Sequence, residues 1–305
     1  MAEPGSTRGT LPRLRSLLFV PGSRADWLEK GMSSPADGLV LDLEDAVTLD
    51  AKAEARQVVA DFVAHRGADK PLFVRINELS RRDALDDLLA VGNENLAGVM
   101  VPKIESAFEV QFVDKILSWI ETEQDIPHGK IRIIPVIETA RAVKFAFELA
   151  DASPRTAYMG PACGQGGDME RAIGYRWTTA GTESAAYRAN TLIDLRAAGA
   201  PNPMLGIFTD IADLEGLRAF AEHTRTIGYE GMVAIHPSQV PVINEVFSQT
   251  EEELEYYQGL VAAMDAAERA GQAAATYRGQ MVDIAMATTA QQRLDAAAAE
   301  RGARS

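Results

Sequence analysis

Eight short apolar runs recur along the chain, and each ends in polar or charged residues. They occupy residues 16–22, 38–45, 71–77, 98–104, 132–138, 156–161, 205–211 and 232–238. The segments between them, such as 48–67 and 107–121, place apolar residues at i, i+3 and i+4. This spacing predicts amphipathic helices, whereas the continuous apolar runs predict strands that are buried on both faces.

Strands that alternate with helices in this way indicate a parallel sheet. Eight such units match a (β/α)₈ TIM barrel, a fold that typically takes about 250 residues. We therefore predict an α/β protein with a barrel over residues 13–248. A doubly wound open sheet is the rival architecture, but it usually has fewer strands and a nucleotide-binding motif after the first one.

The chain continues beyond the eighth unit for more residues than a closed barrel needs. Residues 248–271 predict a strong helix, the pattern breaks around Tyr277 and Gly279, and a further helix ends in a polar tail. We expect residues 249–305 to form a C-terminal helical extension, either a flap over its own barrel or an arm on a neighbouring subunit. Residues 1–12 are polar and are expected to be a disordered tail.

Composition narrows the classes of partner. The formal net charge of −14 argues against nucleic acid or an anionic membrane, although it leaves room for a local basic pocket. Cys163 is the single cysteine, so no internal disulfide can form and a reducing compartment is favoured. No run reaches the roughly 18 apolar residues of a membrane span. We expect a cytoplasmic protein.

Acidic side chains follow the fifth and sixth predicted strands. Active sites of barrels lie at the carboxyl ends of the strands, so Glu138 and Asp168 are expected at one mouth. Two carboxylates with waters and substrate oxygens are a usual Mg²⁺ site. The alternatives are an ion pair of Glu138 with Arg75 or Lys103, and an N-cap role for Asp168.

Other charged residues end the second and third strands. The guanidinium of Arg75 suits a carboxylate or an enolate oxygen, and the alternative is that it neutralises Glu44 or Asp45. These two acids are candidates for orienting metal-bound waters, with an N-cap or supporting role as the alternative. Lys103 is expected to be an ion-pair partner of these acids.

The segment 160–174, GPACGQGGDMERAIG, is rich in glycine but matches no phosphate-binding motif. It lacks the third glycine of a dinucleotide fingerprint and the Gly-Lys-Ser/Thr of a P-loop. We expect its glycines, Gly167 among them, to let backbone N–H groups approach a small carboxylate while Asp168 reaches a metal.

Six motifs carry a resemblance to a known family. RSLLFVPGSR, LVLDLEDAV, FVRIN, VPKIES, IPVIET and AIHPSQV, in this order and spacing, resemble the citrate lyase β-subunit-like branch of the HpcH/HpaI aldolase superfamily. That branch includes malyl-CoA and citramalyl-CoA lyases. The resemblance runs from about Arg15 to Asp283, which is nearly the whole chain.

The resemblance implies an oligomeric barrel, a homotrimer or hexamer, that depends on Mg²⁺, with Mn²⁺ as an alternative. It implies that Glu138 and Asp168 are the metal carboxylates and that Arg75 contacts substrate. It also implies that Asp283, in the C-terminal segment, closes the site of a neighbouring subunit. The chain departs from the family at Ala172, which stands where relatives commonly have a second acid.

The implied activity is reversible aldol or Claisen-type cleavage of a carboxylated 3-hydroxyacyl-CoA such as malyl-, citramalyl- or citryl-CoA. Its partners are an acyl-CoA and a small oxo-acid such as glyoxylate, pyruvate or oxaloacetate. Arg15, Arg24 and Lys30 are candidates for the CoA phosphates. The alternatives are a CoA-independent class II pyruvate aldolase, and a non-catalytic or partner-dependent citrate lyase β-like subunit.

Overall fold

The computed structural model describes residues 11–302, so most of the expected N-terminal tail lies outside the described residues. The chain divides into two compact units between Phe247 and Ser248. The first unit contains all eight strands of the parallel sheet, and the second contains two helices and a hairpin.

All eight predicted strands are present in the first unit. They are β1 (Ser16–Pro21), β2 (Gly38–Asp42), β3 (Leu72–Arg75), β4 (Gly98–Val101), β5 (Arg132–Ile137), β6 (Gly160–Pro161), β7 (Met204–Leu205) and β8 (Gly231–Ala234). They pair in the order β6-β5-β4-β3-β2-β1-β8-β7, always in parallel.

Backbone hydrogen bonds between the two edge strands complete the ring. The amide of Met204 donates to the carbonyl of Met159 at 2.9 Å, and the amide of Gly206 donates to the carbonyl of Pro161 at 3.1 Å. A Cβ added to Gly160 would lie only 1.7 Å from the carbonyl oxygen of Met204, so this crossing requires glycine. The predicted TIM-barrel class is confirmed.

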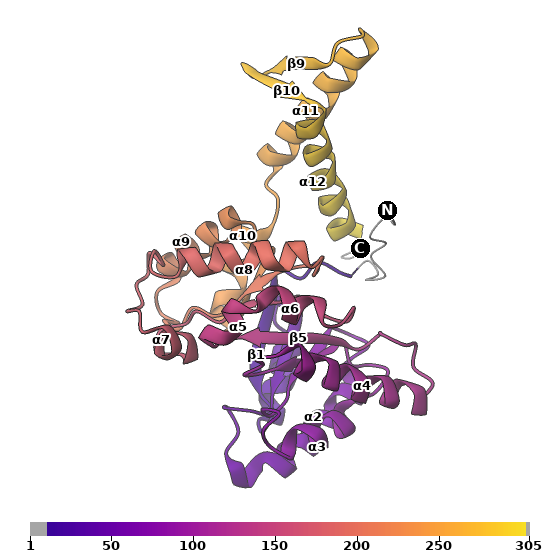
Figure 1. Cartoon of the computed structure of the whole chain (residues 1–305), viewed down its shortest axis with the longest axis vertical. Helices are drawn as coiled ribbons and strands as arrows, with labels where there is room; N and C mark the ends of the chain where they lie inside the picture. Colours follow the sequence, from indigo (N-terminus) through magenta and orange to yellow (C-terminus); the bar gives the residue numbers. More distant parts are fainter. Residues whose placement is uncertain (1–10, 303–305) are drawn as a thin grey trace. The chain divides into compact units, whose positions relative to one another are not determined.

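Helices surround the strands, as the ribbon around β1 and β5 shows in Figure 1. They are α1 (Ala25–Met32), α2 (Lys52–Arg66), α3 (Asp83–Val91), α4 (Ala107–Glu123), α5 (Ala140–Lys144), α6 (Ala146–Asp151), α7 (Asp168–Ile173), α8 (Ala185–Ala197), α9 (Leu214–Ile227) and α10 (Val240–Phe247), with short 3₁₀ turns at Leu49–Ala51 and Pro237–Gln239. Ser106 begins α4 with a capping box formed with Glu109.

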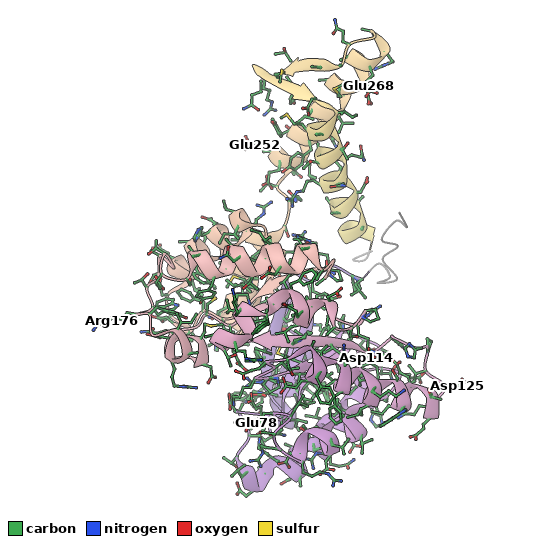
Figure 2. All side chains as sticks on the ribbon, in the orientation of Figure 1. Glu78, Asp114, Asp125, Arg176, Glu252 and Glu268 are labelled. Carbon is green, nitrogen blue, oxygen red and sulfur yellow. The ribbon has the colours of Figure 1, made fainter. Side chains whose placement is uncertain are left out.

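The strands bury both faces. One face packs against the helices in a large apolar cluster, whereas the other fills the barrel interior with residues such as Val40, Phe73 and Met100. Along β5, Ile134 and Val136 point into the interior, so Arg132 and Glu138 flank that interior at opposite ends of the strand. Charged side chains such as Asp125 and Arg176 lie on the outer surface (Figure 2).

The second unit differs from the purely helical extension that its sequence predicts. Helix α11 (Glu251–Arg269) is followed by an antiparallel hairpin of β9 (Ala274–Tyr277) and β10 (Gln280–Asp283), and α12 (Ile284–Gly302) comes next. Leu260, Met264 and Val282 form its small apolar cluster with Ala287 and Ala290. Within residues 11–302, no helix is both long and apolar enough to cross a membrane.

Candidate active site at the carboxyl ends of the strands

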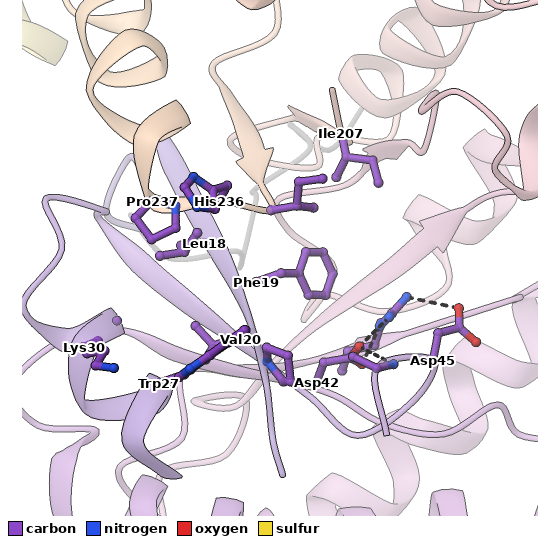
Figure 3. A pocket seen from close by; sticks show the side chains of 15 residues that line it. Leu18, Phe19, Val20, Trp27, Lys30, Asp42, Asp45, Ile207, His236 and Pro237 are labelled. Carbon is purple, nitrogen blue, oxygen red and sulfur yellow. Dashed lines mark hydrogen bonds and ion pairs between the residues drawn. The ribbon is translucent and has the colours of Figure 1, made fainter. Parts of the chain in front are cut away.

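Two neighbouring cavities open at the carboxyl ends of the barrel strands. Their volumes are about 610 and 270 Å³, and both are lined by Phe19, Asp45, Arg75 and Ile207. Figure 3 shows the larger cavity, with Trp27 and Lys30 from α1 on one side of it. The smaller cavity contains Glu138 and Asp168, so the structure brings these two acids and Arg75 to one space.

Arg75 ends β3 and is held by three acids. Its Nε and Nη2 donate to the two carboxylate oxygens of Asp42 at 2.7 and 2.6 Å, and its Nη1 lies 3.0 Å from Glu44 Oε2 and 3.8 Å from Asp45 Oδ2. These acids raise the pKa of Arg75, although burial opposes ionisation. Two of the five guanidinium N–H groups are donated to Asp42, which leaves three directed elsewhere. Figure 3 marks the contacts with Asp42 and Asp45.

Asp42 is a residue of this network that was not among the predicted site residues. It is 2% exposed, and its carboxylate also accepts from the amides of Glu44 at 2.9 Å and Ala46 at 3.1 Å. The turn after β2 is therefore tied to Arg75 through one side chain. A buried acid inside the apolar run LVLD signals such a paired role, because its burial needs a cation or donors.

Glu44 lies between two cations. Its Oε1 accepts from Lys103 Nζ at 2.9 Å, while Oε2 faces Arg75 without accepting a hydrogen bond from any described residue. Burial raises the pKa of Glu44, and Arg75 and Lys103 oppose that shift. The hydrogen bond to Glu44 in turn raises the pKa of Lys103. The expected pairing of Lys103 with an acid is present, and its partner is Glu44.

Glu138 is 6% exposed and lies directly after β5. Its Oε1 accepts from the backbone amide of Lys103 at 2.7 Å, and Lys103 adopts a left-handed backbone with φ of 52°. Burial raises the pKa of Glu138 to about 7, and the nearby carboxylates of Glu44 and Asp168 act in the same direction. The structure thus places an incompletely compensated carboxyl group in the cavity wall. A peptide amide holds it, rather than the side chain of Arg75 or Lys103.

Asp168 is the first residue of α7, and Gly167 occupies the N-cap position. The carboxylate of Asp168 pairs with Arg171 one turn later and also lines the smaller cavity. Gly167 lines that cavity as well, but its amide donates to the carbonyl of Gly164 at 3.3 Å. The amide of Gly166 donates to Glu170 at 2.6 Å. These two amides are therefore engaged within the loop, unlike the expected approach of free N–H groups to a substrate carboxylate.

The larger cavity is mainly apolar and extends along β1, α1 and the end of β8. Leu18, Val20 and Trp27 line it, together with Lys30 and His236. Arg24 stacks over the Trp27 ring at 4.2 Å and pairs with Asp26, so it lies beside this cavity. A largely apolar wall with a few cations at its edge suits a long ligand that ends in charged groups.

Two of the expected site residues belong to other parts of the chain. Arg15 precedes β1, at the amino end of the barrel, where it pairs with Asp37 at 2.6 Å; the structure does not bring it to the cavities. Asp283 ends β10 in the second unit, and its Oδ1 accepts from the amide of Met286 at 3.0 Å, which caps the start of α12.

The carboxylates of the smaller cavity can be compared with the ligands that a metal ion requires. Among residues 11–302, no group of three or more histidine, cysteine, aspartate or glutamate side chains has metal-site geometry. Mg²⁺ keeps several waters and is commonly bound through one or two carboxylates. The buried, raised-pKa carboxyl of Glu138 beside Asp168 fits this mode of binding, since a cation would compensate both charges.

Comparison with known proteins agrees with this geometry. The family model of HpcH/HpaI aldolase/citrate lyase matches residues 15–237. The L-malyl-CoA/β-methylmalyl-CoA lyase of Cereibacter sphaeroides is 35% identical over 89% of this chain and 90% of its own length. The citrate lyase subunit β-like protein of Deinococcus radiodurans is 36% identical, with coverages of 90% and 93%. A (3S)-malyl-CoA thioesterase of C. sphaeroides is 32% identical, with coverages of 92% and 93%.

A solved structure shows the same fold. The protein CitE of Mycobacterium tuberculosis, crystallised with magnesium, acetoacetate and coenzyme A, superposes with a TM-score of 0.72 at 29% identity, covering 95% of this chain and 99% of that one. The relatives named as lyases and the matched family model identify the chain as a lyase-type enzyme. The chain belongs to the HpcH/HpaI aldolase/citrate lyase family.

Proposed function

We propose that this protein is a Mg²⁺-dependent carbon–carbon lyase that reversibly cleaves a carboxylated 3-hydroxyacyl-CoA, such as malyl-, citramalyl- or citryl-CoA. The observation that carries the proposal is the meeting of Glu138, Asp168 and Arg75 in one cavity at the carboxyl ends of the strands. The lyase names among the relatives and the magnesium, acetoacetate and coenzyme A bound to the CitE structure support it.

Glu138 and Asp168 would hold the ion. Asp45, which lines the same cavity, and Glu44 would orient its waters. When bound, Mg²⁺ supplies Lewis acidity to the hydroxyl or keto oxygen and the adjacent carboxylate of the oxo-acid half. The hydrogen bond from the Lys103 amide fixes one oxygen of Glu138 at 2.7 Å, so the carboxylate presents its other oxygen in a defined direction. Manganese is an alternative ion because its oxygen preferences are similar.

Arg75 would stabilise the charge that develops on the acyl-CoA half. In cleavage the hydroxyl oxygen loses its proton to a base and forms the carbonyl of the oxo-acid. The bond between the hydroxyl-bearing carbon and the carbon next to the thioester breaks, and its electron pair passes to the thioester enolate. The guanidinium N–H groups not donated to Asp42 are available for that oxygen. Because Asp42 fixes the orientation of the guanidinium, Arg75 would bind the enolate oxygen without a rearrangement of its side chain.

The larger cavity would receive the acyl-CoA. Its apolar wall along Val20 and Trp27 suits the pantetheine chain, and Lys30 and Arg24 are candidates for the phosphates. Asp283 from a neighbouring subunit of a homotrimer or hexamer would exchange a proton at the enolate carbon. This last role rests on the family resemblance alone.

One relative favours a second candidate reaction, hydrolysis of the thioester. That reaction would release free coenzyme A and a hydroxydicarboxylate from the same substrate, with no carbon–carbon cleavage. A third candidate is a pyruvate aldolase that does not use coenzyme A, and a fourth is a citrate lyase β-like subunit that acts only with partner subunits. Excess coenzyme A should compete with substrate for the acyl-CoA lyase and not for the pyruvate aldolase.

The deciding experiment is product analysis of the purified full chain with Mg²⁺ and a panel of malyl-, citramalyl-, β-methylmalyl- and citryl-CoA. Mass spectrometry should detect an acyl-CoA and an oxo-acid in equal amounts, while a thiol reagent detects no free coenzyme A. Release of free coenzyme A without any oxo-acid would show that the protein is a thioesterase and not a lyase. Turnover that appears only with added partner subunits would favour the partner-dependent subunit.

A further inference from the structure

A further cavity, lined by several polar residues, lies at the amino end of the barrel, away from the candidate active site. Its volume is about 600 Å³. It is lined by residues that precede β3 and β4, by Arg132 at the start of β5, and by Tyr158. Lys70 and Lys130 also face it, so three cations meet at this end of the fold.

Arg132 is the unusual member of this group. Its Nε is buried and makes no hydrogen bond with any described residue, although the side chain as a whole is only partly buried. Burial lowers its pKa, and the charge of Arg155 acts in the same direction, whereas Tyr158 and Glu121 oppose the shift. A buried polar group without a partner is costly, so such a group commonly has a ligand, ion or water as its partner.

Other buried arginines of this chain are matched by partners. Arg155 pairs with Asp114 at 2.5 Å and Glu121 at 2.6 Å, and Arg15 pairs with Asp37. Arg188 lacks a carboxylate, and its Nε is likewise buried without a hydrogen bond to a described residue, but its Nη2 donates to the carbonyl of Gly181 and its guanidinium lies over the ring of Phe220. Arg132 thus differs from Arg155 and Arg15, because no carboxylate of a described residue pairs with it although the chain contains 44 acidic residues.

The charges around Arg132 leave the cavity positive. Lys130 is exposed at the rim, while Lys70 is held by the carbonyls of Met32 and Ser34 at 2.9 and 2.8 Å and contributes only its charge. Of the two acids that line the cavity, Asp69 is paired with Arg66 at 2.9 Å, and Glu94 remains on the rim. A local positive site matters here because the net charge of −14 repels anions elsewhere.

We propose that this cavity binds a small, doubly charged oxyanion of the phosphate or dicarboxylate class, held by the guanidinium of Arg132 with Lys130 as the second cation. The fork of the guanidinium matches two oxygens of either group. The cavity is lined on its other sides by Tyr158, whose hydroxyl donates to the carbonyl of Pro12 at 2.8 Å, and by Phe73. The site is separate from the proposed reaction and does not depend on it.

The test is isothermal titration of inorganic phosphate into the full chain without divalent metal, at an ionic strength held constant with NaCl. The wild type should bind phosphate saturably at one site, and Arg132→Met should weaken binding about tenfold or more. Lys115→Met removes an exposed cation of α4 that lies outside this cavity and should bind as the wild type does. Malonate in a parallel titration separates a dicarboxylate preference from a phosphate preference.

Thermal unfolding gives an independent readout. Phosphate should raise the unfolding midpoint of the wild type but not that of Arg132→Met, because ligand binding to the native state stabilises it. In NaCl alone, Arg132→Met should melt no lower than the wild type, since it removes a partly buried charge whose Nε has no hydrogen-bond partner among the described residues. The proposal is overturned by absence of saturable binding, by an equal loss of binding in Lys115→Met and Arg132→Met, or by a lower midpoint of Arg132→Met in NaCl alone.

Discussion

Glu138 places a carboxyl group where burial opposes its ionisation, and this has a consequence for metal binding. Its pKa is raised to about 7, so the carboxyl group is protonated below that pH and ionised above it. A proton and Mg²⁺ compete for the same oxygens. The affinity for Mg²⁺ should therefore fall about tenfold for each pH unit below 7, and change little above about 8.

Calorimetric titration of Mg²⁺ at pH 6, 7 and 8 measures this dependence. Asp45→Asn is the matched control, because it removes a carboxylate from the same cavity without touching Glu138, and it should keep the dependence. An affinity that does not change between pH 6 and 8 would show that Glu138 does not bind the ion.

Removing either proposed metal carboxylate should abolish turnover while leaving the fold intact. Glu138→Ala and Asp168→Ala are each expected to reduce Mg²⁺-dependent cleavage by about 10³-fold or more, because the reaction loses both positioning and charge stabilisation. Circular dichroism and the oligomer mass serve as controls for folding. A variant that retains a near-normal rate removes that residue from the metal site.

Lys103 combines two roles in one residue, and substitution can separate them. Its ammonium pairs with Glu44, and its left-handed backbone, with φ of 52°, directs the amide to Glu138. Lys103→Gly and Lys103→Ala both lose the ion pair, but only alanine resists the left-handed conformation. Lys103→Ala should be less stable than Lys103→Gly by about 1 kcal/mol, a difference of about 2–4 °C in the unfolding midpoint. The opposite order would show that the backbone relaxes on substitution.

At the scale of elements, the pattern of apolar runs predicts where strands occur better than where they end. Of the run at 156–161, only Gly160–Pro161 forms a strand. Of the run at 205–211, only Leu205 is in a strand, because β7 consists of Met204–Leu205. Tyr158 has a positive φ of 54°, which interrupts the extended conformation inside the first run. Hydrophobicity records burial and contains no information about such backbone turns.

The hairpin in the second unit was missed for a related reason. Ala274–Tyr277 and Gln280–Asp283 are short, and Val282 is their one buried residue, so their sequences lack the alternation of apolar and polar residues by which strands are predicted. The turn signal was Arg278-Gly279, where both residues have positive φ, 49° and 80°. Two such residues in a two-residue loop form a type I′ turn, which favours Asn-Gly.

Changes at this turn should alter the hairpin in opposite directions. Arg278→Asn should strengthen it, because asparagine accepts a positive φ more readily, and Gly279→Ala should weaken it by about 1 kcal/mol. Amide hydrogen exchange of residues 274–283 is the measurement, with the barrel strands as an internal reference. Equal exchange in the two variants would contradict the turn assignment.

For the whole molecule, chain order locates the site but does not determine which charges pair. The rule that barrel sites lie at the carboxyl ends of strands brought Arg75, Glu138 and Asp168 together correctly. It did not reveal that Asp42 would hold Arg75, since a pairing between neighbouring strands depends on side-chain direction. Arg15 was assigned to the substrate because of its charge, although it precedes β1 and so lies at the other end of the barrel.

The proposed division of one site between two subunits gives the last prediction. Glu138 belongs to the barrel and Asp283 to the second unit, and each single variant, Glu138→Ala or Asp283→Ala, should be inactive. In a closed ring of exchanged subunits mixed in equal amounts, a site built from two chains would be intact in about one case in four. A site built within one chain would be intact in none, because every chain lacks one of the two acids. Native mass spectrometry must show mixed oligomers before the rates are compared. Recovery of about a quarter of the wild-type rate supports the shared site, and a fully exchanged but inactive mixture assigns Asp283 to the site of its own chain. An Asp283→Ala variant that is active by itself would leave Asp283 without a catalytic role.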